Sequence, residues 1–161
     1  FTASISSGSA GFNYRAISDI LPCPSDIERI DITVHPNPTV ATGMINACSG
    51  FTKTGNLNPL VSGDGAPFTF TGPFSQVNGT ATVNPNGTFT FTPNPGVTGG
   101  SFTFGVTTSF GCTGSGTELI IVNDSPATTG VTGSVCSNST LNGTLTGAVS
   151  GGTPPYVFSR V

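Results

Sequence analysis

Charged side chains are scarce in this sequence. Asp, Glu, Lys and Arg make up 7% of the 161 residues, against a usual share of about a quarter. The formal net charge is −3, and the four fixed cations are Arg15, Arg29, Lys53 and Arg160. So few cations cannot neutralise a row of phosphates. The composition therefore argues against nucleic acid as a partner.

Serine and aspartate are present, but the residue combinations that perform nucleophilic or metal chemistry are missing. The sequence has a single histidine, His35, beside Pro36, and it has no Cys-x-x-Cys pair and no Gly-x-Ser-x-Gly elbow. A nucleophile needs a neighbouring base, and a zinc site needs several thiolate or imidazole ligands. We therefore predict no catalytic residues, no zinc site and no enzyme activity. We expect His35 to be a solvated linker residue.

Long hydrophobic runs are missing as well. None approaches the roughly 18 to 20 apolar residues of a membrane helix, and no basic-then-apolar signal segment opens the sequence. We therefore expect no membrane insertion. The four cysteines, together with many threonines and asparagines, fit an extracellular protein in an oxidising environment.

Glycine (23 residues), proline (13) and phenylalanine (12) are abundant, and many phenylalanines stand in alternating runs. In the stretch 75–94, Ala81 and Val83 alternate with threonines on one arm, and Phe89 and Phe91 do so on the other. Residues 84–87, between the arms, read Asn-Pro-Asn-Gly, which is typical of a tight turn. A period of two on both sides of a turn predicts a β-hairpin. The pattern indicates an all-β fold.

The sequence repeats itself with a period of 88 residues. The shift that places Cys48 on Cys136 also aligns other residues: Pro38 with Pro126, Leu57 with Leu145, residues 61–63 with residues 149–151, and residues 67–70 with residues 155–158. Residues 1–34 match the end of the repeat, with a shift that drifts from 90 to 88 across a loop. We therefore expect the chain to be a segment of a longer tandem array.

The period divides the chain into three parts. Residues 1–34 are predicted to be the C-terminal half of one repeat, residues 35–124 a complete repeat, and residues 125–161 the N-terminal half of the next. Seven short strands in about ninety residues predict tandem Ig-like β-sandwich repeats, one complete and two partial. The expected strands are 39–46, 53–60, 66–71, 76–83, 87–92, 100–108 and 117–123. The expected core is Phe68, Phe70, Ala81, Val83, Phe89, Phe91, Phe102, Phe104, Val106, Leu119 and Ile121.

Each partial repeat should leave an apolar face and sheet edges uncovered. Either the chain continues beyond both parts, or the half repeat of one subunit is completed by that of another, as in strand-complementation filaments. We favour continuation, because strand-exchange subunits usually carry one short donor strand and not half a domain.

The four cysteines allow more than one pairing. The simplest disulfide joins Cys48 and Cys112 within the complete repeat, and it would stabilise the fold by about 3 to 4 kcal/mol. Cys23 and Cys136, their equivalents in the partial repeats, would then pair outside residues 1–161. The alternative joins Cys23 to Cys48 and Cys112 to Cys136, but an extended array would place these pairs far apart.

The boundary that contains Asn123 and Asp124 resembles the acidic linkers that hold calcium between cadherin-like repeats. Its counterpart, residues 34–38, has no carboxylate. A rigid proline-containing linker is therefore the better interpretation, with Ca²⁺ at Asn123 and Asp124 as the alternative.

Residues 149–159, which include Ser-Gly-Gly-Thr-Pro-Pro-Tyr, resemble the repeats of Bacteroidetes gliding-motility adhesins of the SprB type and of related giant surface proteins. The Gly111-Cys112 pair and the Val122–Pro126 boundary are similar to other marks of that group, although Phe158 stands where a Trp is usual. Residues 80–92 also resemble a run of bacterial cadherin-like adhesin repeats.

The resemblance implies a long protein exported by a type IX-like route and displayed on the cell surface as a filament for attachment, gliding or capture of other cells. The expected partners are other copies of the same chain, other cells and surfaces. The alternative is a carbohydrate- or protein-binding Ig-like module that acts through loops 56–65 or 109–116.

Overall fold

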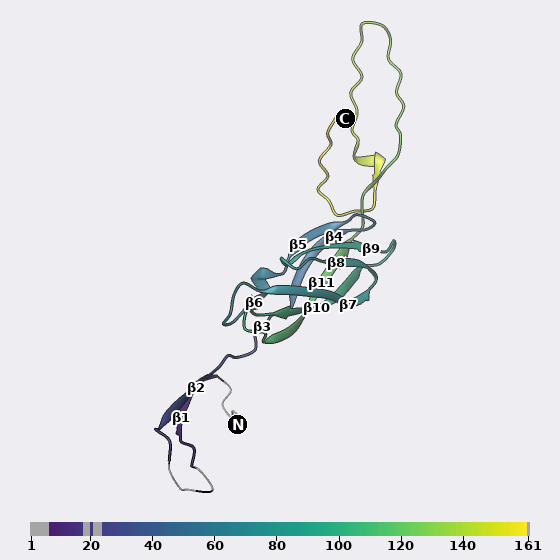
Figure 1. The fold of residues 1–161 in the computed structure, drawn as a ribbon. Coiled ribbons are helices and arrows are strands. Elements are labelled where there is room, and N and C mark those ends of the chain that lie inside the picture. Colours follow the sequence, from purple (N-terminus) through teal and green to yellow (C-terminus); the bar gives the residue numbers. More distant parts are fainter. Residues whose placement is uncertain (1–6, 18–19, 21–23, 161) are drawn as a thin grey trace.

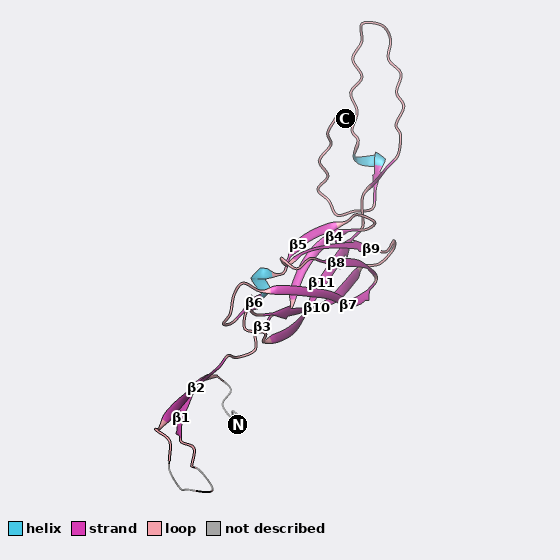
Figure 2. Ribbon diagram, viewed as in Figure 1, coloured by secondary structure: helices cyan, strands magenta, loops and turns pink. Residues whose placement is uncertain are grey.

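The computed structural model describes residues 7–17, 20 and 24–160. Its strands form an antiparallel hairpin at the N-terminal side, a β-sandwich in the middle, and one short strand pair in the C-terminal segment (Figure 1). Coloured by secondary structure, the described residues contain strands, loops and two short 3₁₀ turns (Figure 2). Within the described residues, no helix is long and apolar enough to cross a membrane.

Nine strands build the middle part: β3 (Thr39–Val40), β4 (Gly43–Cys48), β5 (Lys53–Asn56), β6 (Val61–Ser62), β7 (Thr69–Val77), β8 (Gly79–Val83), β9 (Thr88–Pro93), β10 (Gly99–Thr107) and β11 (Thr113–Asn123). The expected strand 39–46 is split into β3 and β4. The expected strand 53–60 ends at Asn56, because the 3₁₀ turn Asn58–Leu60 follows it with a proline in its first positions.

Two sheets make the sandwich. One has the order β4-β11-β10-β7 and the other the order β5-β9-β8, with β3 and β6 paired separately. All pairs are antiparallel except β4 and β11, which run parallel. The predicted hairpin is formed by β8 and β9, and its turn is closed by hydrogen bonds between Asn84 N–H and the Thr88 carbonyl and between Gly87 N–H and the Asn84 carbonyl, each 2.9 Å.

Phenylalanine rings from both sheets fill the space between them. Phe102 of β10 packs against Phe89 and Phe91 of the opposite sheet, with ring centroids 4.9 and 6.2 Å apart, and Phe104 lies beside Phe70 at 6.1 Å. These five rings are almost fully buried, as are Ala81 and Val106. Phe68 and Val83 are partly buried against the same cluster. The rings that close the sandwich therefore come from both sheets.

The predicted phase of β11 is wrong. The sequence pattern places Leu119 and Ile121 in the core, but they are 37% and 42% exposed, whereas Ile120 and Val122 are buried. The stretch Leu-Ile-Ile-Val is apolar on both faces of the strand, so its alternation does not reveal which face is inside. The buried face of β11 carries Glu118 together with Ile120 and Val122. Because glutamate is a charged residue type, Glu118 interrupts the apolar alternation that would otherwise identify this face.

The strands outside the sandwich repeat its local geometry. In the N-terminal hairpin, β1 (Gly8–Tyr14) pairs with β2 (Glu28–Val34) so that Phe12 faces Ile30, just as Phe102 faces Glu118 in the β10–β11 pair. These positions differ by 90 and 88, the shifts at which the sequences align.

The C-terminal segment shows the same correspondence at a shift of 88. The pair β12 (Ala127–Thr128) and β13 (Val149–Ser150) has the register of β3 and β6. The 3₁₀ turn Thr146–Ala148 corresponds to Asn58–Leu60, and the hydrogen bond from Thr129 N–H to the Ala148 carbonyl corresponds to that from Ala41 to Leu60.

Neighbouring isoleucines of β11 test its phase. We expect Ile120→Ala to lower the free energy of unfolding by about 2 to 5 kcal/mol, because it leaves a cavity in the core. The matched variant Ile121→Ala, on the outer face, should lower it by less than about 1 kcal/mol. Urea denaturation of both full-length variants measures the two values. Equal losses would mean that the strand has no single buried face.

Candidate functional site: the two ends of the sandwich

The strand β11 runs the length of the sandwich and separates two ends. We call the entry end the region where the linker residues 35–38 reach β3, and the exit end the region where β11 finishes at Asn123. Because β4 runs parallel to β11, its last residue, Cys48, lies beside Asn123 at the exit end. The loop before β11, with Cys112, lies at the entry end.

His35 organises the entry end. Its Nδ1 is 2.7 Å from Oδ2 of Asp64, and its ring stacks on Phe110 with centroids 3.6 Å apart and planes 12° from parallel. The Ser109 N–H donates to the Gly65 carbonyl at 2.7 Å, which joins the two loops that carry Asp64 and Phe110. The expectation of a solvated histidine is therefore wrong, since its side chain is 26% exposed.

Cys112 is also attached to the entry linker. Its thiol donates to the His35 carbonyl, with sulfur and oxygen 3.5 Å apart. The Cys112 N–H donates to the hydroxyl of Thr108 at 3.1 Å, and the Thr108 N–H donates back to the Cys112 carbonyl at 2.9 Å. These bonds fix the turn between β10 and β11, so the sulfur points at the chain that enters the sandwich.

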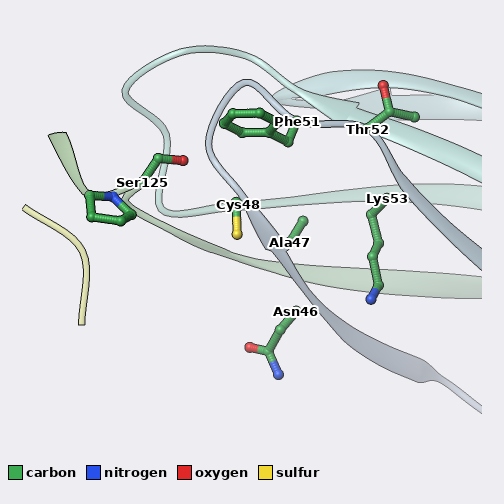
Figure 3. A pocket seen from close by; sticks show the side chains of 8 residues that line it. Asn46, Ala47, Cys48, Phe51, Thr52, Lys53 and Ser125 are labelled. Carbon is green, nitrogen blue, oxygen red and sulfur yellow. The ribbon is translucent and has the colours of Figure 1, made fainter. Parts of the chain in front are cut away.

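A groove of about 500 Å³ lies at the exit end. Figure 3 shows Phe51 over one side of it and Cys48 with its sulfur turned away from that ring. The groove is lined by Asn46, Ala47, Cys48, Phe51, Thr52, Lys53, Ser125 and Pro126. The Ser49 N–H donates to the Asn123 carbonyl at 2.9 Å, and the Ser125 hydroxyl donates to the Ser49 carbonyl at 3.1 Å. The exit linker is thereby held against the residues that follow β4.

The predicted disulfide between Cys48 and Cys112 is wrong. The two residues lie at opposite ends of β11, and ten residues of strand span about 33 Å, whereas the Cα atoms of a disulfide lie within about 7 Å. Cys48, Cys112 and Cys136 are all free. The alternative bond from Cys112 to Cys136 would have to cross the whole sandwich, and Cys23 lies outside the described residues.

Glu118 is a buried ionisable group that the sequence pattern does not reveal. It is 2% exposed on β11, opposite Gly43 of β4, and a Cβ at Gly43 would collide with the Glu118 carboxylate. Burial raises the pKa of Glu118 to about 7. Glycine at position 43 therefore makes room for a carboxyl group that is half protonated near neutral pH.

The calcium alternative at Asn123 and Asp124 stays a prediction. The amide of Asn123 lies 3.5 Å from Asn46 Oδ1 and from the Ala47 carbonyl, so it acts as a donor to β4. Across the part of the chain that the structure describes, no three His, Cys, Asp or Glu side chains gather as a metal site would require.

The sandwich geometry agrees with a comparison of the sequence with known families. Residues 37–121 match the family described as Bacterial Ig domain, and this range contains all nine strands of the middle part except the last two residues of β11. The chain belongs to this family of Ig-like domains. Domains of the family are typical of extracellular and surface proteins, and they are usually structural modules without catalysis. No curated protein matches the sequence.

Glu118 makes stability depend on pH. Because its pKa is higher in the folded state than in the unfolded one, its contribution is full below about pH 4.5 and is lost as the pH rises through about 7. We expect the free energy of unfolding to fall by on the order of 2 to 3 kcal/mol over that interval, and Glu118→Gln to remove this fall. Denaturation at several pH values measures it.

The matched control is Glu28→Gln, at an exposed position of β2. This variant should keep the pH profile of the unchanged protein, because the carboxyl group that it removes lies in solvent. If the Glu118→Gln variant showed the same dependence on pH as the unchanged protein between about pH 4.5 and 8, the assignment to Glu118 would be contradicted.

Proposed function

We propose that this protein is a structural segment of an extracellular adhesive filament, in which Ig-like sandwiches follow one another head to tail. The observation that carries the proposal is the repeated geometry on both sides of the sandwich. The β1–β2 hairpin has the register of β10 and β11, and the β12–β13 pair has the register of β3 and β6. Residues 1–34, 35–124 and 125–161 are then parts of three successive repeats.

Exposed apolar side chains in the outer parts support this division. Tyr14 and Leu145 are 49% and 46% exposed, whereas their equivalents in the sandwich, Phe104 and Leu57, are fully buried. Phe158, the equivalent of the buried Phe70, is also exposed. Each outer part thus carries the residues of a core without the second sheet that would cover them. In the proposed array, the rest of the same repeat supplies that sheet.

The positions of the two ends support an extended arrangement. The chain enters the sandwich at His35 and leaves it beyond Asn123, at the other end of β11. The linkers contain Pro36, Pro38 and Pro126, which limit backbone freedom. Successive sandwiches joined in this way form a shaft whose length grows with the number of repeats.

The low charge supports side-by-side association of such shafts. With 7% charged residues, the outer faces of the sheets can meet another copy without burying ions. Residues 149–159 resemble repeats of gliding-motility adhesins. By analogy, the proposed filament is exported by a type IX-like route and serves attachment, gliding or capture of other cells. Its partners are then other copies of the chain and the surfaces of cells.

A second candidate is a module that binds carbohydrate or protein through its loops. The observation in its favour is Phe110, which is 52% exposed and held by the stack on His35 at the entry end, where the loops 63–65 and 108–112 meet. A fixed exposed ring is a surface on which a sugar can stack. Binding of a glycan array by the full chain, lost in Phe110→Ala, would favour this function.

Immunogold electron microscopy on intact cells of the source organism tests the filament. We expect antibodies against residues 35–124 to label extracellular fibres along their length, at many positions per fibre, because the epitope recurs in each repeat. Cells opened before labelling serve as the matched control. Label found only after the cells are opened, or at a single point of each fibre, would contradict the proposal.

A further inference from the structure

The two cysteines of the sandwich lie at opposite ends, and the repeat brings their equivalents together. Cys112 contacts the carbonyl of residue 35, and Cys48 lies beside residue 123. These two linker positions are 88 residues apart, which is one period of the repeat. We propose that Cys48 of each repeat forms a disulfide with the cysteine equivalent to Cys112 in the following repeat. The inference rests on the tandem array proposed above.

The hydrogen bonds around the linker carry this argument. The His35 carbonyl accepts from the Cys112 thiol, and the Asn123 carbonyl accepts from the Ser49 N–H, next in sequence to Cys48. In an array, the following repeat has its own cysteine at the Asn123 carbonyl, because Asn123 is its equivalent of His35. Both cysteines are then neighbours of the same peptide group, one from each repeat.

The distances suit a disulfide. Cys48 and Asn123 face each other in adjacent strands, which lie about 4.8 Å apart, and the Cys112 sulfur lies 3.5 Å from the His35 carbonyl oxygen. Two cysteines that both adjoin residue 123 in this way are close enough for the Cα separation of a disulfide, which is about 4.4 to 6.8 Å. The groove beside Cys48, with Phe51 and Pro126 in its lining, lies where the β10–β11 loop of the following repeat would meet this sandwich. The Cys48 residue is exposed, and its sulfur is turned away from Phe51, as Figure 3 shows.

The bond requires an oxidant. The two thiols lose two protons and two electrons as the sulfur–sulfur bond forms, and a disulfide compound accepts them and becomes two thiols. A boundary closed in this way has two covalent connections, the linker and the disulfide. Tension along the shaft would then be carried by both connections. Stretching of the linker alone could therefore not separate two neighbouring sandwiches.

The test uses a chain lengthened by one period, with a second copy of residues 35–122 inserted after Val122. In a buffer of oxidised and reduced glutathione, we expect Cys48 of the first copy to pair with Cys112 of the second in most molecules, and the number of free thiols to fall by two. Trypsin cleaves after Lys53 and so separates each Cys48 from the Cys112 of the same copy. Mass spectrometry of unreduced peptides then shows residues 30–53 of the first copy linked to residues 54–160 of the second copy. Because the second peptide also contains Cys136, fragmentation of the linked pair identifies which of its two cysteines is bonded.

Three variants locate the bond. Cys48→Ser in the first copy should abolish it, whereas Cys48→Ser in the second copy, or Cys136→Ser, should leave it in place. The proposal is overturned if Cys48 of the first copy stays reduced, or if it pairs with a cysteine other than Cys112 of the second copy.

Small-angle X-ray scattering of the same lengthened chain separates this inference from the array. If the inserted copy adds the length of one sandwich to the maximum dimension while both thiols stay free, the array stands and the disulfide is refuted. If the inserted copy adds no such length, the array fails, and the disulfide fails with it.

Discussion

Closure of two sheets over a layer of phenylalanine rings is the interaction on which this structure depends. Phe102 touches Phe89 and Phe91 across the gap between the sheets, so the ring is buried only when both sheets are present. Tyr14 and Leu145, which lie in parts with a single strand pair, are half exposed although their equivalents are buried. These positions are therefore buried only where both sheets are present.

The direction of β11 determines which residues lie at each end of the sandwich. This strand carries the chain from the entry end to the exit end, and its parallel neighbour β4 brings Cys48 to the same exit. Apart from the buried Glu118, the groups with distinctive chemistry consequently lie at the two ends of the sandwich, with His35, Asp64 and Cys112 at one and Cys48 at the other. Thiols and hydrogen-bonding side chains at both ends are suited to contacts with neighbouring domains, as in the array proposed above.

Sequence patterns could predict the parts of this fold that depend on local contacts. The hairpin around residues 84–87 was predictable because its turn residues and its alternation are both local, and the all-β class followed from the same signals. The phase of β11 was not, because apolar residues occupy both of its faces. The environment of His35 depends on Asp64 and Phe110, which are distant in sequence. Which cysteines lie close together depends on the order and direction of the strands, and no local sequence pattern contains that information.

The central claim is that sandwiches recur every 88 residues along one chain. Single-molecule stretching of the native full-length protein in reducing buffer tests it most directly, because each sandwich that unfolds releases its own chain. The account predicts a series of equal steps, each with a released contour length of about 300 Å before subtraction of the folded length, from 88 residues at about 3.5 Å each. Steps of unequal length, or a single step for the whole protein, would contradict it.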